Sequence, residues 1–136
     1  YQVAWRIFKE HPVTGVGPGN WAAYRMRHVD GITMLPHNLA GLLLATLGLL
    51  GTVTFVGYLV ATVARGVRER RARKGWTDPW ERGIRAFVGA MLFTLFLLFV
   101  SGIAAHNLGR WSWYWAPALL LAAATARPDA ATEADA

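Results

Sequence analysis

The sequence contains no cysteine, which excludes a disulfide scaffold and any metal site built from thiolates. Acidic residues are also few, 8 against 14 Lys and Arg, and before residue 65 they are only Glu10 and Asp30. No pattern ties these two carboxylates together as a glycosidase pair. The four histidines form no H-E-x-x-H or similar pattern, and no serine nucleophile elbow is present. We therefore predict no bound metal ion and no cofactor.

Long apolar runs, by contrast, dominate the chain. Hydrophobic residues make up 54% of it and charged residues 16%. Residues 39–64 carry no charge and, at about 1.5 Å per helical residue, exceed the roughly 30 Å hydrocarbon core of a bilayer. Residues 86–105 match about one bilayer thickness, whereas residues 116–126 are short and contain Pro117. The sequence thus predicts an all-α, polytopic integral membrane helix bundle with two to three transmembrane helices.

A basic segment, residues 65–85, separates the first two apolar runs. It contains eight Lys or Arg residues against three acids, and a short loop this basic stays in the cytoplasm. It lacks the aromatic and glycine spacing of a base-reading module. We therefore expect a topology determinant that contacts anionic membrane lipids, and no nucleic-acid partner.

The orientation of that loop places residues 1–36 outside the cytoplasm. They begin with a short amphipathic helix over residues 1–11, expected on or near the membrane surface, which ends at Pro12 before a glycine-rich turn. The chain opens in the middle of this helix without a signal pattern, so we expect a piece of a longer protein whose site is incomplete and inactive alone. The alanine-rich acidic tail, residues 127–136, is expected to be disordered.

Small residues recur in the first apolar run. Gly41, Ala45, Gly48 and Thr52 follow one another at steps of four, three and four, which places them on one helix face where another helix approaches closely. His37 lies four residues before Gly41, so we expect it above this stripe, facing the bundle interior.

His37 also has cations near it on the predicted outer face. These are Arg6, Lys9, Arg25, Arg27 and Arg110. A leaving diphosphate needs positive charge, and an attacking hydroxyl needs a base with a pKa near neutrality, which imidazole provides. A histidine at a membrane boundary is more often an interfacial residue, and interface arginines are as often structural, so the residues alone leave both interpretations open.

Two stretches together resemble a known family. The sequence HPVTGVGPGNW followed by HNLAGLLLATLGLLG is similar to the C-terminal part of the O-antigen ligase and polymerase family of membrane proteins. The ligase signature is matched by His37, Asn38, Gly48 and Gly51. The family's glycine-rich loop is matched by Pro12, Gly15, Gly17, Pro18, Gly19 and Asn20.

This resemblance implies a metal-independent glycosyltransferase of the inner (cytoplasmic) membrane, such as those of lipopolysaccharide and polysaccharide biosynthesis. It would move a glycan from undecaprenyl diphosphate to an acceptor hydroxyl on a lipid, glycan or protein, together with the remaining helices of the full-length protein. His37 would be the catalytic base on the non-cytoplasmic side. Arg25, Arg27 and Asn38 are the candidate substrate-binding residues, and the motif glycines are structural.

Two alternatives remain open. A repeat-unit polymerase of the same family fits the same motifs. A non-catalytic transport or scaffold subunit, whose outer loop only packs against a partner, belongs to another class. His106 and Asn107 repeat the His-Asn pair without the following glycines, and we expect either an interfacial pair or a second lining of the same cavity.

Overall fold

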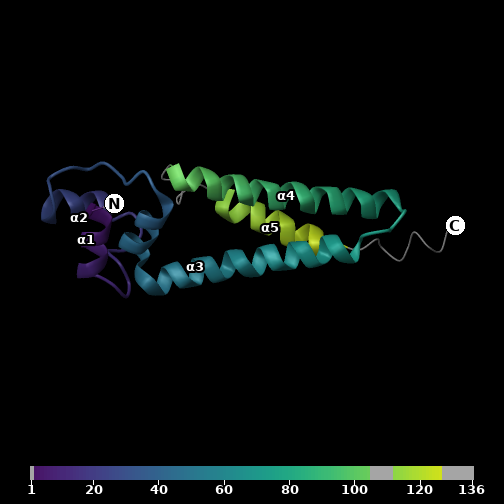
Figure 1. Cartoon of the computed structure of the whole chain (residues 1–136), viewed down its shortest axis with the longest axis horizontal. Coiled ribbons are helices and arrows are strands. Elements are labelled where there is room, and N and C mark those ends of the chain that lie inside the picture. Colours follow the sequence, from purple (N-terminus) through teal and green to yellow (C-terminus); the bar gives the residue numbers. More distant parts are fainter. Residues whose placement is uncertain (1, 105–111, 127–136) are drawn as a thin grey trace.

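The computed structural model describes residues 2–104 and 112–126, and its regular elements there are all helices (Figure 1). They are α1 (Gln2–Glu10), α2 (Trp21–His28), α3 (Leu39–Ala72), α4 (Pro79–Ala104) and α5 (Ser112–Thr125). The long helices α3 and α4 run alongside each other with α5 packed against both, while α1 and α2 form a small head at one end. The all-α prediction is confirmed for this part of the chain.

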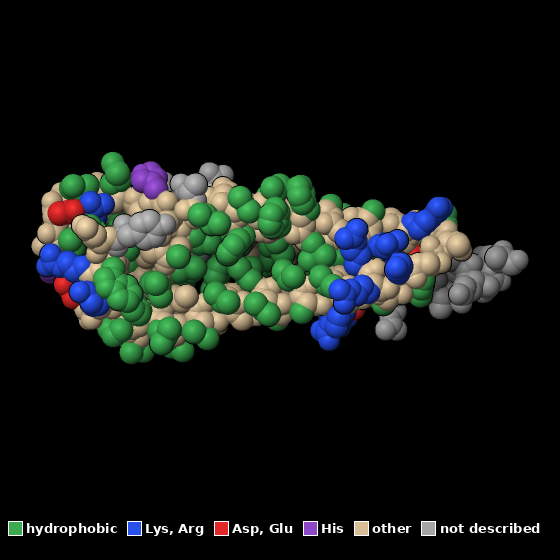
Figure 2. All heavy atoms as spheres, in the orientation of Figure 1, with side chains coloured by type: hydrophobic (Ala, Val, Ile, Leu, Met, Phe, Trp, Pro, Cys, Tyr) green, Lys and Arg blue, Asp and Glu red, His purple; other side chains and the backbone are tan. Residues whose placement is uncertain are grey.

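Two of these helices, α3 and α4, are long and apolar enough to cross a membrane. Helix α5 is shorter, with 14 residues, and Pro117 lies inside it. Figure 2 shows a band of hydrophobic side chains between two ends that carry the charges. Large side chains in this band are exposed, including Leu50 and Val53 on α3 and Phe93 on α4. So large an apolar surface is unusual on a soluble monomer and favours a membrane location.

Helix α3 is broken at Gly48, so the prediction of one continuous span over residues 39–64 is wrong in this respect. Gly48 has φ 63° and ψ −165°, a backbone conformation that essentially only glycine adopts. The first part of α3, residues 39–47, turns away from the long part that follows (Figure 1). The sequence pattern did not reveal the break because every residue around it is apolar or small.

The glycine-rich loop fills this break with backbone hydrogen bonds. The N–H groups of Val16 and Gly17 donate to Ala45 O and Thr46 O, both at 2.9 Å. On the other side, Leu49 N donates to Pro12 O at 2.8 Å and Leu50 N donates to Val13 O at 3.1 Å. Carbonyl and amide groups that a broken helix leaves unpaired are thus satisfied by the protein itself. We call the contact between residues 12–17 and 45–50 the glycine joint.

Two glycines allow the loop backbone and the α3 backbone to approach closely in the glycine joint. A Cβ atom at Gly15 would overlap the backbone of Thr46 and Gly48, and a Cβ atom at Gly48 would overlap the backbone of Val13 and Gly15. Gly15 also has a positive φ of 64°. A side chain is therefore excluded at both positions by sterics as well as by backbone conformation.

The predicted small-residue stripe is correct only in its first half. Helix α1 packs on Gly41 and Ala45: a Cβ at Gly41 would lie 3.1 Å from the Ala4 Cβ, and Ala45 is fully buried. At Gly48 the neighbour is the loop rather than a helix. The apolar side of α1 therefore packs on α3, with Ile7 buried, and its expected position on or near the membrane surface stays a prediction.

At the opposite end, most of the predicted basic loop is helical. Helix α3 continues to Ala72, and α4 begins at Pro79 after the side chain of Asp78 accepts a hydrogen bond from Glu81 N at 3.0 Å. Aspartate before a proline at the first helical position is a common helix start. Buried Arg73 pairs with Glu81 and donates to Ala126 O at 3.1 Å, which ties the end of α5 to both long helices.

We predict that Gly48→Ala opens the glycine joint. The substituted residue would have to hold a conformation that costs about 1–3 kcal/mol, in addition to its overlap with Val13. Amide hydrogen exchange of residues 45–50 in the full-length protein in detergent should accelerate by at least about tenfold.

Gly57→Ala is the matched control for this variant. Gly57 is helical, and a Cβ added there meets no atom within 4 Å. Alanine is the better helix former by about 1 kcal/mol, so exchange in the joint should be unchanged or slower. Unchanged exchange in Gly48→Ala would contradict the steric account of the joint.

Candidate functional site

The candidate site lies on the head, which is built on the first part of α3. Ala4 and Ile7 of α1 form a buried cluster with Trp21 of α2 and with Leu42 and Ala45 of α3. This cluster holds the two short helices against the half-helix that follows the His-Asn pair. The short helices are thus fixed by packing instead of by their own length, which is too small for stability in isolation.

Asn38 is the N-cap of α3. Its backbone is extended, and its Oδ1 accepts a hydrogen bond from Gly41 N at 2.5 Å. Its side chain is buried, with 6% of the residue exposed. The structure therefore gives Asn38 the role of starting the half-helix, and the predicted substrate-binding role has no support from its exposure.

His37 precedes this cap and is exposed. Because Asn38 is extended, the helical spacing that placed His37 above Gly41 does not reach it. The predicted helical register of His37 above Gly41 is therefore not formed, and its orientation toward the remaining helices of the bundle stays a prediction. The imidazole lies instead at the start of the half-helix, where the helix dipole favours an anionic group.

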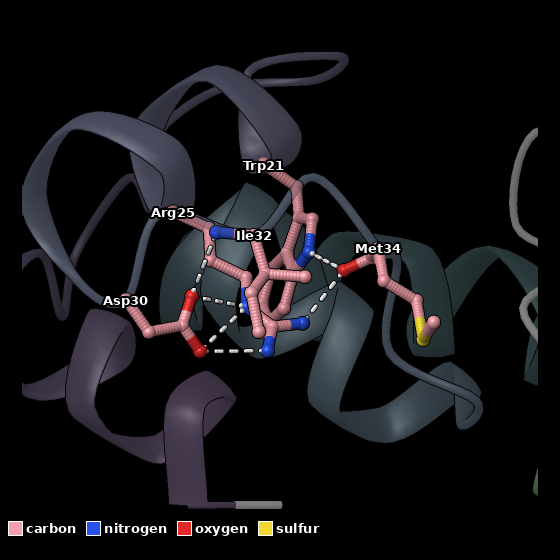
Figure 3. Close-up of polar contacts among 5 residues, drawn as sticks. All are labelled: Trp21, Arg25, Asp30, Ile32 and Met34. Carbon is pink, nitrogen blue, oxygen red and sulfur yellow. Dashed lines mark hydrogen bonds and ion pairs between the residues drawn. The ribbon is translucent and has the colours of Figure 1, made fainter.

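Hydrogen bonds from Arg25 hold residues 30–34, the segment that leads to His37 (Figure 3). Its Nε donates to Asp30 Oδ1 at 2.8 Å, its Nη2 donates to Asp30 Oδ2 at 2.7 Å, and its Nη1 donates to Met34 O at 2.8 Å. The same Met34 carbonyl accepts from the buried Trp21 indole at 2.9 Å, and Asp30 also accepts from Ile32 N at 3.2 Å. Residues 30–34 are therefore held on α2, three residues before His37.

These contacts define what Arg25 does. Its guanidinium is already used by a carboxylate and a carbonyl, so Arg25 positions the His37 segment and is not a free cation for substrate. The hydrogen bonds from Arg25 lower the pKa of Asp30. A lowered carboxyl pKa means that the stabilisation is complete at neutral pH and is lost only as the pH falls through that lowered value.

Arg27 differs from Arg25. It is exposed on α2, and its guanidinium makes no polar contact with the other residues that the structure describes. Arg27 is therefore the cation of α2 that is available to an anionic ligand. Arg6 donates to Glu10 Oε1 at 3.1 Å instead.

A polar network between α1 and α2 was missed from the sequence. Tyr24 OH donates to Glu10 Oε2 at 2.8 Å, and His11 Nε2 lies 3.0 Å from the same hydroxyl. The hydrogen bond from Tyr24 lowers the pKa of Glu10 and raises the pKa of Tyr24. In the sequence, only the four-residue spacing between Arg6 and Glu10 could have indicated part of this network. Glu10 is thereby a structural carboxylate rather than a candidate acid.

The structure brings the two motif stretches together. Gly15 and Gly17 of the upstream loop contact the break that contains Gly48. Gly19 lies in the turn before α2 with φ 78°, and Gly51 packs on Leu47 one helical turn earlier. His106, Asn107 and Arg110 lie outside the described residues, so their expected roles stay predictions.

An open apolar groove of about 740 Å³ adjoins the glycine joint. It is lined by Thr14, Leu47, Leu50, Gly51, Thr54, Phe55, Tyr58 and Tyr114. Groups of three His, Asp or Glu side chains able to hold a metal ion do not occur among residues 2–104 and 112–126. The groove suits a hydrocarbon chain, since its wall offers little polar surface.

Comparisons of the chain with protein-family models, curated proteins and solved structures gave no match. The resemblance to the ligase and polymerase family therefore depends on the two motifs and on their order in the sequence. The geometry adds that the two motifs are in contact.

We predict that Arg25→Ala frees the segment before His37. The variant removes the bidentate hydrogen bonds to the Asp30 carboxylate and one of the two donors to Met34 O. Amide exchange of residues 30–36 should accelerate by about tenfold or more, since a charged hydrogen bond contributes about 1.5 kcal/mol or more. Arg27→Ala, which removes an exposed cation of the same helix, is the control and should leave this exchange unchanged.

Proposed function

We propose that this chain is the C-terminal portion of a membrane glycosyltransferase of the O-antigen ligase type. It would transfer a glycan from undecaprenyl diphosphate to an acceptor hydroxyl. The observation that carries the proposal is the glycine joint: the two stretches named by the resemblance are distant in sequence, yet four backbone hydrogen bonds join them. A repeat-unit polymerase of the same family remains the nearest alternative.

In this proposal the protein is a polytopic bundle of the inner membrane. Helices α3 and α4 cross the bilayer, and the apolar band of Figure 2 faces lipid or the remaining helices. The basic end, residues 65–85, lies in the cytoplasm, because basic residues flanking transmembrane helices remain on that side. The head with His37 then lies on the opposite side of the membrane.

The proposed chemistry uses His37 as a general base. Its neutral imidazole accepts the proton of the acceptor hydroxyl while the hydroxyl oxygen attacks the anomeric carbon of the glycan. The bond from that carbon to the diphosphate oxygen breaks, and the diphosphate leaves with the electron pair. Arg27 and the amino end of the half-helix supply positive charge on this side, and cations of the remaining helices complete the site.

The structure of the head supports a fixed base. Arg25 and Trp21 both donate to Met34 O, and Asn38 caps the helix on the other side, so the backbone is anchored on both sides of His37. A positioned imidazole contributes more to proton transfer than a mobile one, because the reacting geometry need not be found at each turnover. The groove beside the joint would accept part of the polyprenyl chain.

We predict that His37→Ala in the full-length protein lowers the rate of glycan transfer by about 10²–10⁴-fold, which is the usual contribution of a general base. The rate is measured with lipid-linked donor and purified acceptor. The matched control is His28→Ala, which removes another exposed histidine of the head and should retain nearly full activity.

The same pair of variants separates the enzyme from a scaffold. A scaffold tolerates His37→Ala but is sensitive to changes at Gly41 and Gly48, where the backbone packs closely. Normal transfer by His37→Ala with normal membrane insertion would remove the base assignment.

We also predict opposite sides of the membrane for residues 34 and 77. This chain contains no cysteine, so Met34→Cys and Thr77→Cys each add one thiol at an exposed position, in a full-length protein whose other cysteines are first replaced by serine. In intact cells a membrane-impermeant maleimide should label Cys variants at position 34 but not at 77, and both should react after permeabilisation. Labelling of position 77 in intact cells would reverse the orientation and contradict the proposed function.

A further inference from the structure

The half-helix, residues 39–47, packs against α5 as well as against the head. Trp113 of α5 is buried, with 1% exposed, and forms a hydrophobic cluster with Leu39 and Leu43. These two leucines are four residues apart and therefore lie on one face of the half-helix. Beyond the break, the Phe55 ring lies edge-to-face with the Trp113 indole, with 5.5 Å between the ring centroids. Trp113 thus contacts α3 on both sides of the break.

The end of the half-helix that is nearest to His37 depends on this contact. On another side of the half-helix, Leu42 and Ala45 pack with α1 and α2, and the glycine joint holds its carboxyl end. The first turn is farthest from the joint, and Trp113 supports it from α5. At about 1.5 Å per residue the half-helix is about 13 Å long, so a tilt of about 5° about the joint moves its first residue by about 1 Å.

Helix α5 is itself fixed along its length. Leu120 is fully buried and belongs to the same cluster as Val88 of α4. On the α3 side, a Cβ atom added at Gly66 would lie 2.9 Å from the Leu120 Cδ1. At the carboxyl end, Ala126 O accepts a hydrogen bond from Arg73. The Trp113 indole is therefore carried by a helix that is anchored independently of the half-helix.

We propose that Trp113 is a positioning residue for glycan transfer. Its indole holds the first turn of the half-helix through Leu39 and Leu43 and thereby fixes the position of His37. Displacing a reacting group by about 1 Å can lower a rate by about 10²-fold, so such a residue affects turnover without contacting substrate. The inference rests on the proposed function, and its test has a part that does not depend on glycan transfer.

That part is amide hydrogen exchange of the full-length protein in detergent. Trp113→Ala should accelerate exchange of residues 41–47 by at least about tenfold, because replacing a buried aromatic side chain by alanine is among the most destabilising core changes. The matched control is Trp115→Ala, which truncates the same residue type in the same helix where it is 63% exposed. In the control, exchange of residues 41–47 should change by less than about twofold.

The kinetic signature of positioning is a loss of kcat without a change in KM. Measured per inserted protein, Trp113→Ala should lower kcat by about 10- to 100-fold and leave the KM for the lipid-linked donor within about threefold. Trp113→Phe keeps an aromatic ring against Leu39 and Leu43 and should recover at least about a third of the original kcat.

A double-mutant cycle with His37 distinguishes positioning from general damage to the fold. If Trp113 acts through His37, adding Trp113→Ala to His37→Ala should lower the residual rate by less than about twofold. Should Trp113→Ala fail to insert, Leu43→Ala removes the same contact from the half-helix, and it should give the same exchange and the same cycle.

Two results would overturn the proposal. One is unchanged exchange of residues 41–47 in both Trp113→Ala and Leu43→Ala. The other is a fractional loss of rate that is as large in the His37→Ala background as with His37 present. Normal transfer by His37→Ala would remove the proposed base and this inference with it, and accelerated exchange in Trp113→Ala would then show that the proposed function, not the contact, had failed.

Discussion

The break in α3 at Gly48 is the constraint on which the rest of the head depends. Breaking a helix leaves amide and carbonyl groups without partners, and a buried polar group without a partner is costly. The loop of residues 12–17 supplies partners for both sides of the break. It does so only because neither Gly15 nor Gly48 carries a side chain at the point of contact. The positions of α1 and α2 follow, since the loop connects them.

The charges are used differently at the two ends. In the head, Asp30 pairs with Arg25, and Glu10 accepts hydrogen bonds from Tyr24 and Arg6. The segment before His37 is therefore held by polar contacts rather than by a hydrophobic core. At the basic end, the acids neutralise only some of the cations, and several arginines are exposed. The head is therefore organised by internal pairs, whereas the basic end retains positive charge that its acids do not neutralise.

The proposed reaction would make use of both features. A general base needs a fixed backbone and access to substrate, and the backbone is anchored at Met34 and at Asn38, on either side of the exposed residue His37. The half-helix that starts at Leu39 places its amino end beside that ring, and amino ends of broken membrane helices are common sites for anionic substrate groups. In this proposal the apolar groove along the joint would take the lipid part of such a substrate.

Sequence reasoning alone determined the helical class and the two long apolar helices, and it singled out the two glycine-containing stretches that meet in the joint, because hydrophobic run length and glycine motifs are local properties. It also placed a turn at the glycine-rich loop and a basic segment between the helices. It assigned Arg25 and Asn38 to substrate, since spacing does not reveal which partner a side chain finds. Only the tertiary structure decided that Asn38 caps a helix, that Arg25 holds Met34, and that α3 breaks where Gly15 meets Gly48. Those outcomes depend on backbone conformation and, in the joint, on hydrogen bonds between residues 29 to 37 positions apart, neither of which a hydrophobic pattern encodes.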